Sequence, residues 1–489
     1  MLNGRYLLFN SFAFVLIFLP ATLAGFFLIG RHNTKLAALF LAMASLVFYS
    51  YWDRRYLLLL LLSATFNYSA GYAIGHTISQ NRKWLIAALG IGGDLVLLSY
   101  FKYTNFFLAS INTTLGANLG VMEIVLPLGI SFFTFTQIAF IADVYRGGVR
   151  EYRFLDYLLF VTYFPHLIAG PILHHAEMMP QFAERKTYQP KTDAIYRGAL
   201  LFTIGLTKKI VLADTFAAYA DAVFTAAGGG QKVDFIASWI GALAYTLQIY
   251  FDFSGYTDMA IGSSLMFNIQ LPLNFNSPYK AASIIDFWRR WHMTLSRFLR
   301  DYLYIPLGGN RKGRSRRYLN LLATMTLGGL WHGANWTFVA WGSLHGAYLI
   351  INHAWRAIFP GPRKPCTACR LFGRGLTFLG LLFAWIFFRA STFQAAEIIV
   401  KGVCGMAGVS TDLLAKYGIP DSGLRIAATL LSGLTICWLL PNSWQIVQAA
   451  EKTDPRYQLR IIGSLSVLTF FLLAINSSRG VSKFIYFNF

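Results

Sequence analysis

The sequence predicts an all-α, polytopic integral membrane protein, and three observations support this fold class. Charged residues are only 13% of the 489, apolar residues are 56%, and the mean hydropathy is +0.50. A soluble domain carries about 25% charged residues. Apolar stretches of about 20 residues, enough to cross a bilayer as a helix, recur along the whole chain. The 17% of aromatic residues supplies Phe for bundle cores and Tyr and Trp for membrane interfaces.

These stretches predict about 11 to 13 transmembrane or re-entrant helices. Their expected starts lie near Phe9, Lys35, Tyr56, Trp84, Val121, Phe154, Tyr196, Phe235, Leu319, Ala340, Leu376, Ile426 and Ile461. The sequence shows neither a fixed-period repeat nor a low-complexity tract. We therefore expect residues 1–489 to form one membrane-embedded domain, with its core motifs in residues 121–355.

The net charge of +21 comes from short basic runs between apolar segments, not from one basic domain. This pattern is typical of cytoplasmic loops and of attraction to anionic membrane lipid, and it argues against nucleic acid as a partner. The densest runs lie in residues 297–317 and 356–374, and both are expected to be cytoplasmic.

The four cysteines are too few for a disulfide framework in a chain of this length. Cys366 and Cys369 form a CxxC motif, which we interpret as reduced thiols in a cytoplasmic loop. His166, His174 and His175 lie close together in sequence, but without carboxylates at ligand spacing. No metal site is therefore expected.

The segment Leu319–His353 is apolar and lies between the two basic runs, so it must enter the membrane and return as a hairpin. Its middle, Gly328–Trp336, contains glycines and a polar Asn. A helical leg would carry His332 about 22 Å inward from Arg317.

An ionisable side chain at membrane depth is a candidate functional residue. His332 is open to two interpretations: a neutral core imidazole bound to a neighbouring helix, or a general base. Trp331, Trp336 and Trp341 would then form walls that exclude water. The sequence contains neither GxSxG nor HExxH, so base-assisted direct transfer fits better than a covalent intermediate.

A second cluster spans Asp286–Asn310 and predicts a short helix at the cytoplasmic boundary. Helical spacing would place Trp288 and His292 on one face, with Arg289 and Arg290 on others. These arginines could anchor lipid headgroups, or they could bind a phosphate-rich anionic donor such as coenzyme A.

The stretches Trp331–Trp336 and Trp341–Gly346 resemble the signature of the membrane-bound O-acyltransferase (MBOAT) family. The chain is most similar to the bacterial alginate O-acetyltransferase branch, and the resemblance covers nearly its whole length. The supporting motifs are 126–135, 164–172, 250–262, 287–309 and 484–489. One departure is His166, where the family often has Gln.

The resemblance implies an MBOAT-like bundle around a central tunnel in the bacterial inner membrane. The catalytic histidine would be His332 and the second characteristic histidine His292. From the residues themselves, we expect the substrate to contact Trp331, Asn335, Arg289 and Arg290, and His292, with Asn335, to orient the donor or polarise its carbonyl. Acetyl-CoA would be the donor substrate, and no tightly bound cofactor is expected.

We therefore expect an O-acetyltransferase that moves acetyl groups from cytoplasmic acetyl-CoA toward hydroxyls of an exported, alginate-like or other polysaccharide. In this branch the group usually passes to a periplasmic or membrane-anchored partner of the SGNH-esterase type. Peptidoglycan acetylation and D-alanyl transfer to teichoic acid are alternatives within acyl transfer. A secondary transporter is a more distant one, because internal symmetry is not evident.

Overall fold

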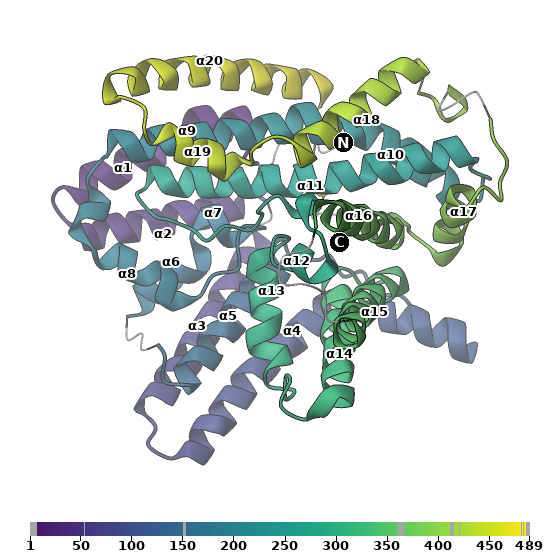
Figure 1. Cartoon of the computed structure of the whole chain (residues 1–489). Helices are drawn as coiled ribbons and strands as arrows, with labels where there is room; N and C mark the ends of the chain where they lie inside the picture. Colours follow the sequence, from purple (N-terminus) through teal and green to yellow (C-terminus); the bar gives the residue numbers. More distant parts are fainter. Residues whose placement is uncertain are drawn as a thin grey trace. The chain divides into compact units, whose positions relative to one another are not determined.

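The computed structural model describes residues 7–52, 54–149, 153–359, 366–410, 415–419, 421–480, 482, 484 and 485. Within these ranges every regular element is a helix, which confirms the predicted all-α fold class (Figure 1). Most of the C-terminal motif 484–489 lies outside the described residues.

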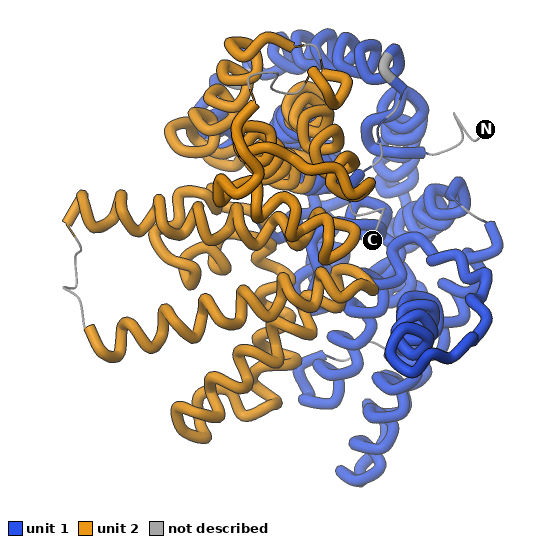
Figure 2. The backbone as a smooth tube through the Cα atoms, turned by 90° about the vertical axis from the view of Figure 1, so that its right-hand side faces the viewer, with its two compact units in different colours: residues 1–206, 256–273, 446–487 blue, residues 207–255, 274–445, 488–489 orange. Residues whose placement is uncertain are grey.

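The chain divides into two compact units, coloured separately in Figure 2. Unit 1 comprises residues 1–206, 256–273 and 446–487, and unit 2 comprises residues 207–255, 274–445, 488 and 489. Among the described residues, the boundaries fall in α9 (Thr192–Thr207), α11 (Phe235–Met266) and α19 (Ser443–Ala450), and in the loop at residues 273 and 274. The expectation of one domain over residues 1–489 stays a prediction.

The helices of unit 1 carry the first half of the sequence and its C-terminal part. They are η1 (Ala13–Phe18), α1 (Leu19–Gly30), α2 (Thr34–Ser50), α3 (Arg55–His76), α4 (Gln80–Leu115), α5 (Ile130–Tyr145), α6 (Phe154–Thr162), α7 (Phe164–Leu167), α8 (His175–Ala183), η2 (Arg185–Tyr188), α9 (Thr192–Thr207), the end of α11 (Phe235–Met266), most of α19 (Ser443–Ala450) and α20 (Pro455–Arg479).

The helices of unit 2 carry the motifs that the sequence singled out. They are η3 (Lys208–Ala213), α10 (Asp214–Gly228), the first part of α11, η4 (Pro278–Lys280), α12 (Ile284–Trp288), α13 (Met293–Leu299), η5 (Arg300–Tyr304), α14 (Gly313–His332), α15 (Trp336–Ile358), α16 (Thr367–Arg389), α17 (Phe393–Val403), η6 (Ala415–Tyr417) and α18 (Gly423–Trp438).

Among the described residues, six helical segments are long and apolar enough to cross a membrane, or seven if the bent pair α18–α19 is one span. The six are Ala13–Gly30, Arg55–His76, Gln80–Leu115, Thr192–Gly228, Thr367–Arg389 and Arg456–Ser478. Apolar helices α2 and α5 are shorter than 18 residues. The protein is therefore multi-pass, while the count of 11 to 13 crossings stays a prediction.

Unit 1 buries polar as well as aromatic side chains. Asn67 of α3 donates to Asp94 of α4 at 2.7 Å and to Gln137 of α5, so one amide joins three helices. All three side chains are at most 2% exposed. His166 is also buried, with its Nε2 2.8 Å from the carbonyl oxygen of Phe160, so this departure from the family pattern has a structural role.

Unit 2 contains the predicted helical hairpin. Helices α14 and α15 lie side by side, joined by the turn 333–335 (Figure 1). Gly329 and Gly342 let the two backbones approach, because a Cβ on Gly342 would lie 3.0 Å from the Cα of Gly329. Thr326 and Ser343 share a hydrogen bond of 3.0 Å across the same interface. Small residues at facing positions are typical of close packing between membrane helices.

The predicted single helix around residues 286–300 is wrong in one respect. Helix α12 ends at Trp288, and α13 begins only at Met293. Trp288 and His292 therefore do not share one helical face. The break occurs because His292 adopts a left-handed backbone conformation, with φ of 43°, which ends one helix and starts the next.

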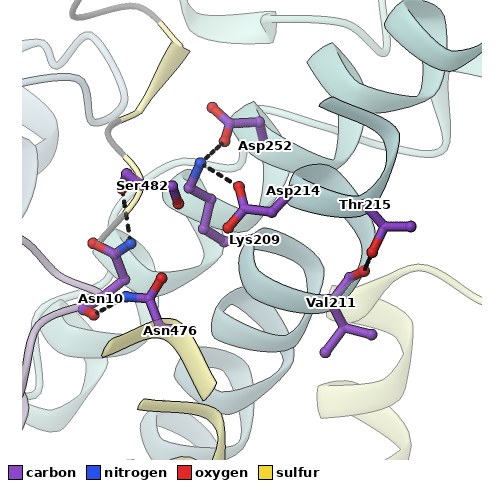
Figure 3. Close-up of polar contacts among 8 residues, drawn as sticks. All are labelled: Asn10, Lys209, Val211, Asp214, Thr215, Asp252, Asn476 and Ser482. Atoms are coloured by element: carbon purple, nitrogen blue, oxygen red, sulfur yellow. Dashed lines mark hydrogen bonds and ion pairs between the residues drawn. The ribbon is translucent and has the colours of Figure 1, made fainter. Parts of the chain in front are cut away.

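Helix α11 carries a buried charge that unit 2 neutralises internally. The ammonium group of Lys209, on the π-helix η3, contacts Asp252 of α11 and lies 3.0 Å from Asp214 of α10 (Figure 3). The side chains of Lys209 and Asp252 are 7% and 3% exposed. A buried lysine needs such partners, because an unpaired charge at this depth is strongly unfavourable.

The expectation of reduced thiols in the CxxC motif is not met. Cys366 and Cys369 are joined by a disulfide at the start of α16. Their Cα atoms lie 5.2 Å apart, within the range that a disulfide requires. The first turn of the helix brings residues three positions apart onto the same side, which makes this pairing possible.

Candidate active site

His332 is the last residue of α14 and lies at the turn of the hairpin. Its side chain is 3% exposed. The neighbouring rings of Trp331, Trp341 and Phe388 have centroids 5.0, 5.1 and 5.3 Å from the imidazole centroid. The ring of Trp341 stands perpendicular to the imidazole. Aromatic walls on several sides thus separate His332 from bulk water.

The sequence places His332 here because the chain leaves the helix directly after it. Gly333 has an extended backbone, with φ of −161° and ψ of 146°. Asn335 then caps α15, its Oδ1 accepting the Thr337 N–H at 3.1 Å. The Asn335 Nδ2 donates to the carbonyl of Ser391 at 2.9 Å. Since both ends of this side chain are engaged, the structure gives Asn335 a role in positioning the turn.

His292 reaches the same site from the other side of the α12–α13 break. It is fully buried and lies in the left-handed region, which is uncommon for a residue other than glycine. Its Nδ1 is 3.1 Å from the Oδ1 of Asn274. Such a conformation persists where the surroundings hold it, and Asn274 supplies that constraint.

The bonds of Asn274 determine which nitrogen of His292 carries the proton. The Asn274 Oδ1 also accepts the Thr294 N–H at 3.3 Å and the Thr294 hydroxyl at 3.0 Å. Because this atom is an acceptor, the Nδ1 of His292 must donate, which leaves a lone pair on Nε2. Within the described residues the Nε2 atom has no hydrogen-bond partner. In this tautomer the Nε2 of His292 can accept a hydrogen bond, and the expectation that His292 orients the donor or polarises its carbonyl stays a prediction.

The structure brings three of the predicted site residues together. The imidazole centroids of His292 and His332 lie 6.3 Å apart. The ring of Trp331 lies 6.3 Å from His292 and 5.0 Å from His332, so it contacts the space beside both. Two buried imidazoles and an aromatic wall form a site that can accept a proton from a hydroxyl in a water-poor environment.

Arg289 and Arg290, which the sequence predicts to contact the substrate, differ from each other in exposure and in their bonds. Arg289 follows the end of α12 and is exposed, whereas Arg290 is half-buried. The Nε of Arg290 pairs with Asp286 at 2.9 Å, and its Nη1 lies 3.4 Å from the carbonyl oxygen of Asn276. Arg290 thus helps to hold the α12–α13 segment, and a role of either arginine in donor binding stays a prediction.

Sequence reasoning missed Asn274, Phe388 and Trp385. Asn274 lies in a loop before η4, and no local pattern connects it with His292. Trp385 and Phe388 come from α16, where they stand among other apolar residues. Their rings stack on or abut Trp341, at 5.7 and 5.0 Å.

His345 of α15 is fully buried and forms a hydrogen bond to an element outside the hairpin. The indole N–H of Trp288 in α12 donates to the Nδ1 of His345 at 3.3 Å. The ring of His345 also lies 4.7 Å from Trp341. His345 therefore ties α12 to the wall of the His332 site.

A hairpin that buries a histidine at its turn, with a second histidine beside it, fits a membrane-embedded acyltransferase. The chain belongs to the membrane-bound O-acyltransferase family, whose model matches residues 46–393. This result confirms the resemblance and sets aside the secondary transporter as a class.

Curated relatives support the same class. The chain is 40% identical to the peptidoglycan O-acetyltransferase of Helicobacter pylori, covering 99% of this chain and 98% of that protein. It is 44% identical to a probable alginate O-acetylase of Pseudomonas aeruginosa, covering 88% and 81%. A teichoic acid D-alanyltransferase of Streptococcus thermophilus is 28% identical over 48% of this chain and 59% of its own length. The protein is therefore an acyltransferase.

Proposed function

We propose that this protein transfers acetyl groups from cytoplasmic acetyl-CoA toward hydroxyls of an exported polysaccharide across the bacterial inner membrane. The observation that carries the proposal is the burial of His332 within an aromatic wall, 6.3 Å from His292. The similarity to two O-acetylating relatives over most of the chain supports acetyl as the group transferred.

In the proposed reaction His332 is the general base. It takes the proton of the acceptor hydroxyl as the oxygen attacks the acetyl carbonyl. The new C–O bond forms, the C–S bond to coenzyme A breaks, and the proton passes from His332 to the departing sulfur. A base of this kind contributes about 10² to 10⁴-fold to the rate.

The rings around His332 have a chemical purpose in this scheme. Water that reached the thioester would hydrolyse it, and would compete with the acceptor hydroxyl. Trp331, Trp341 and Phe388 restrict that access. Their bulk also holds the imidazole in one orientation, which a base needs in order to meet the hydroxyl at hydrogen-bond distance.

His292 has a different role because its Nε2 accepts. It would accept a hydrogen bond from a second donor of the bound substrates, a neighbouring hydroxyl or an amide N–H, and so orient the nucleophile for His332, while Asn274 keeps the proton on Nδ1. The phosphates of coenzyme A would bind on the basic cytoplasmic face, where Arg289 is exposed. The acceptor of the acetyl group would be a periplasmic or membrane-anchored partner of the SGNH-esterase type, which then modifies the glycan.

The test compares cells that produce the wild type or His332→Ala at matched, membrane-inserted levels. We expect glycan O-acetylation to be lost in the variant. His353→Ala is the matched control, since it removes a histidine of the same hairpin in α15, at the end opposite to the turn, and should retain activity. Wild-type acetylation in well-inserted His332→Ala would overturn the assignment of the base.

Peptidoglycan is the second candidate acceptor, and one observation favours it. Among relatives matched over nearly their whole length, the peptidoglycan O-acetyltransferase of H. pylori is 40% identical to this chain and a probable alginate O-acetylase of Pseudomonas putida is 37% identical. The same cells distinguish the two, because O-acetyl groups can be measured separately in purified peptidoglycan and in exopolysaccharide. The fraction that loses acetyl groups in His332→Ala identifies the acceptor.

A further inference from the structure

Two cysteines at the start of α16 form a site that acyl transfer does not use. Cys366 is the N-cap residue of this helix, and Cys369 lies in its first turn. The Sγ of Cys366 accepts the backbone N–H of Cys369 at 3.1 Å. Both residues are exposed on the protein surface at the N-terminal end of the span Thr367–Arg389, and a disulfide joins them.

This position favours the thiolate form of Cys366. The N-terminus of a helix carries partial positive charge and N–H groups without partners in the helix, both of which stabilise an anionic sulfur. The surrounding sequence adds to the effect, since residues 356–389 contain basic side chains, among them Arg370 and Arg374, and no Asp or Glu. A thiolate next to a second cysteine is the arrangement that reactive CxxC motifs use.

On the cytoplasmic side of the membrane, the disulfide between Cys366 and Cys369 can be reduced and formed again. Its basic flanks place the segment on the cytoplasmic side by the positive-inside rule. Thiols there are kept reduced, so a disulfide that forms is transient and is either catalytic or redox-sensing. An exposed pair remains accessible to the small thiols that reduce it.

We propose that Cys366 and Cys369 are a thiol–disulfide exchange site for a small anionic disulfide of the glutathione type. The thiolate of Cys366 attacks one sulfur of glutathione disulfide, forms a mixed disulfide and releases one glutathione thiolate. The thiolate of Cys369 then attacks Cys366, releases the second glutathione and closes the protein disulfide. The two protons of the cysteines end on the two glutathione thiols, and glutathione disulfide gains the two electrons that the cysteines lose.

The site is basic and lies on the protein surface, and both properties favour a small anionic disulfide as its ligand. Glutathione disulfide is net negative, and the basic side chains next to the motif attract it. The site is also separate from the acyltransfer chemistry. Cys369 and Phe388, which contacts His332, are nineteen positions apart in α16, and this spacing corresponds to about 28 Å along the helix.

The test uses the full chain in membranes, with Cys404→Ser and Cys437→Ala removing the remaining cysteines. The protein is equilibrated with glutathione and its disulfide in varied ratios, and free thiols are then counted by alkylation with a maleimide-polymer reagent. We expect both thiols to disappear together as the disulfide fraction rises and to return with excess glutathione. Thiols that stay alkylatable at every ratio would overturn the proposal, as would a disulfide that excess glutathione never reduces.

Single variants identify the attacking sulfur. Serine at position 366 is a good N-cap residue, so Cys366→Ser should fold as the parent does. In Cys369→Ser we expect glutathione to be trapped on Cys366, seen as a stable adduct by mass spectrometry. Cys366 should react with iodoacetamide faster than Cys369, because the N–H groups at the helix N-terminus stabilise its thiolate. Equal rates in the two single variants would contradict the role assigned to the helix N-terminus.

Discussion

The imidazole rings of His292 and His332 lie 6.3 Å apart, although forty positions separate them in the sequence. Each comes from a break between helices: His292 from the α12–α13 junction and His332 from the turn of the α14–α15 hairpin. At helix ends, backbone groups and side chains can project into a site, and both histidines lie at such ends.

Asn274 is expected to support activity without touching substrate. In Asn274→Ala the Nδ1 of His292 loses its acceptor, so the imidazole no longer has a fixed tautomer. We expect the turnover number to fall by about tenfold or more, with little change in KM. Acetyl-transfer kinetics of the purified protein measure this split.

Thr294→Val is the control for this prediction. It removes one of the donors to Asn274 but leaves the bond between Asn274 and His292 in place. Its effect on turnover should therefore be much smaller. An Asn274→Ala protein with wild-type turnover would show that the tautomer of His292 does not matter.

The glycine contact inside the hairpin should tolerate no side chain. In Gly342→Ala the new methyl group would lie 3.0 Å from the Cα atoms of both Gly329 and Thr326, so α14 and α15 must move apart. Such overpacking costs about 1–3 kcal/mol, and it would also shift His332. We expect a lower thermal unfolding midpoint together with lower activity.

Gly375→Ala is the matched control, because a Cβ there meets no atom within 4 Å. Alanine in an open helical position stabilises by about 0.4–1 kcal/mol. Equal shifts of the thermal unfolding midpoint in Gly342→Ala and Gly375→Ala would contradict close packing between α14 and α15.

The effects of substitutions at Lys209 and Asp252, the buried ion pair of unit 2, on the free energy of unfolding should depend strongly on each other. Asp252→Ala removes one of the two carboxylates that pair with the Lys209 ammonium, and breaking a buried pair costs about 3–5 kcal/mol. The double variant Lys209→Met, Asp252→Leu should recover most of that loss, since it removes both charges. Thermal unfolding in detergent measures each variant.

An exposed pair provides the comparison. Lys401 and Glu397 of α17 are 57% and 60% exposed, and such pairs contribute about 0–1 kcal/mol. Lys401→Ala should therefore change the midpoint little. A double variant of the buried pair as unstable as Asp252→Ala would argue that the two charges do not compensate each other.

Asp234 should make stability depend on pH in the acid range. Burial raises the pKa of this carboxyl, but the Lys416 ammonium at 2.6 Å and the Ala237 N–H at 3.0 Å outweigh it and hold the pKa below 3.8. As the pH falls, the unfolded chain takes up the proton first. The stabilisation is therefore complete above about pH 4 and is lost as the pH falls through the lower, folded-state pKa.

Thermal midpoints of the wild type and Asp234→Asn provide the measurement. The difference between them should be constant from about pH 7 to pH 5 and should shrink below about pH 4. A difference that grows on acidification would reverse the sign of the pKa shift.

Much of the architecture follows from patterns within single segments. Apolar runs of helical length indicated the all-α membrane fold, and the two flanking basic runs indicated the hairpin with His332 at its turn. The helix expected across Trp288 and His292 was wrong, because nothing local marks a left-handed histidine. That conformation depends on Asn274, which lies outside the segment.

The sequence by itself determined the fold class, the family and the two histidines, because hydrophobic length, charge bias and motif order are local properties of the chain. Only the tertiary structure decided that His292 and His332 meet, which nitrogen of His292 accepts, and which α16 rings complete the wall. These are contacts between segments far apart in sequence. Their geometry depends on how helices pack, and packing is determined by all of the partners at once.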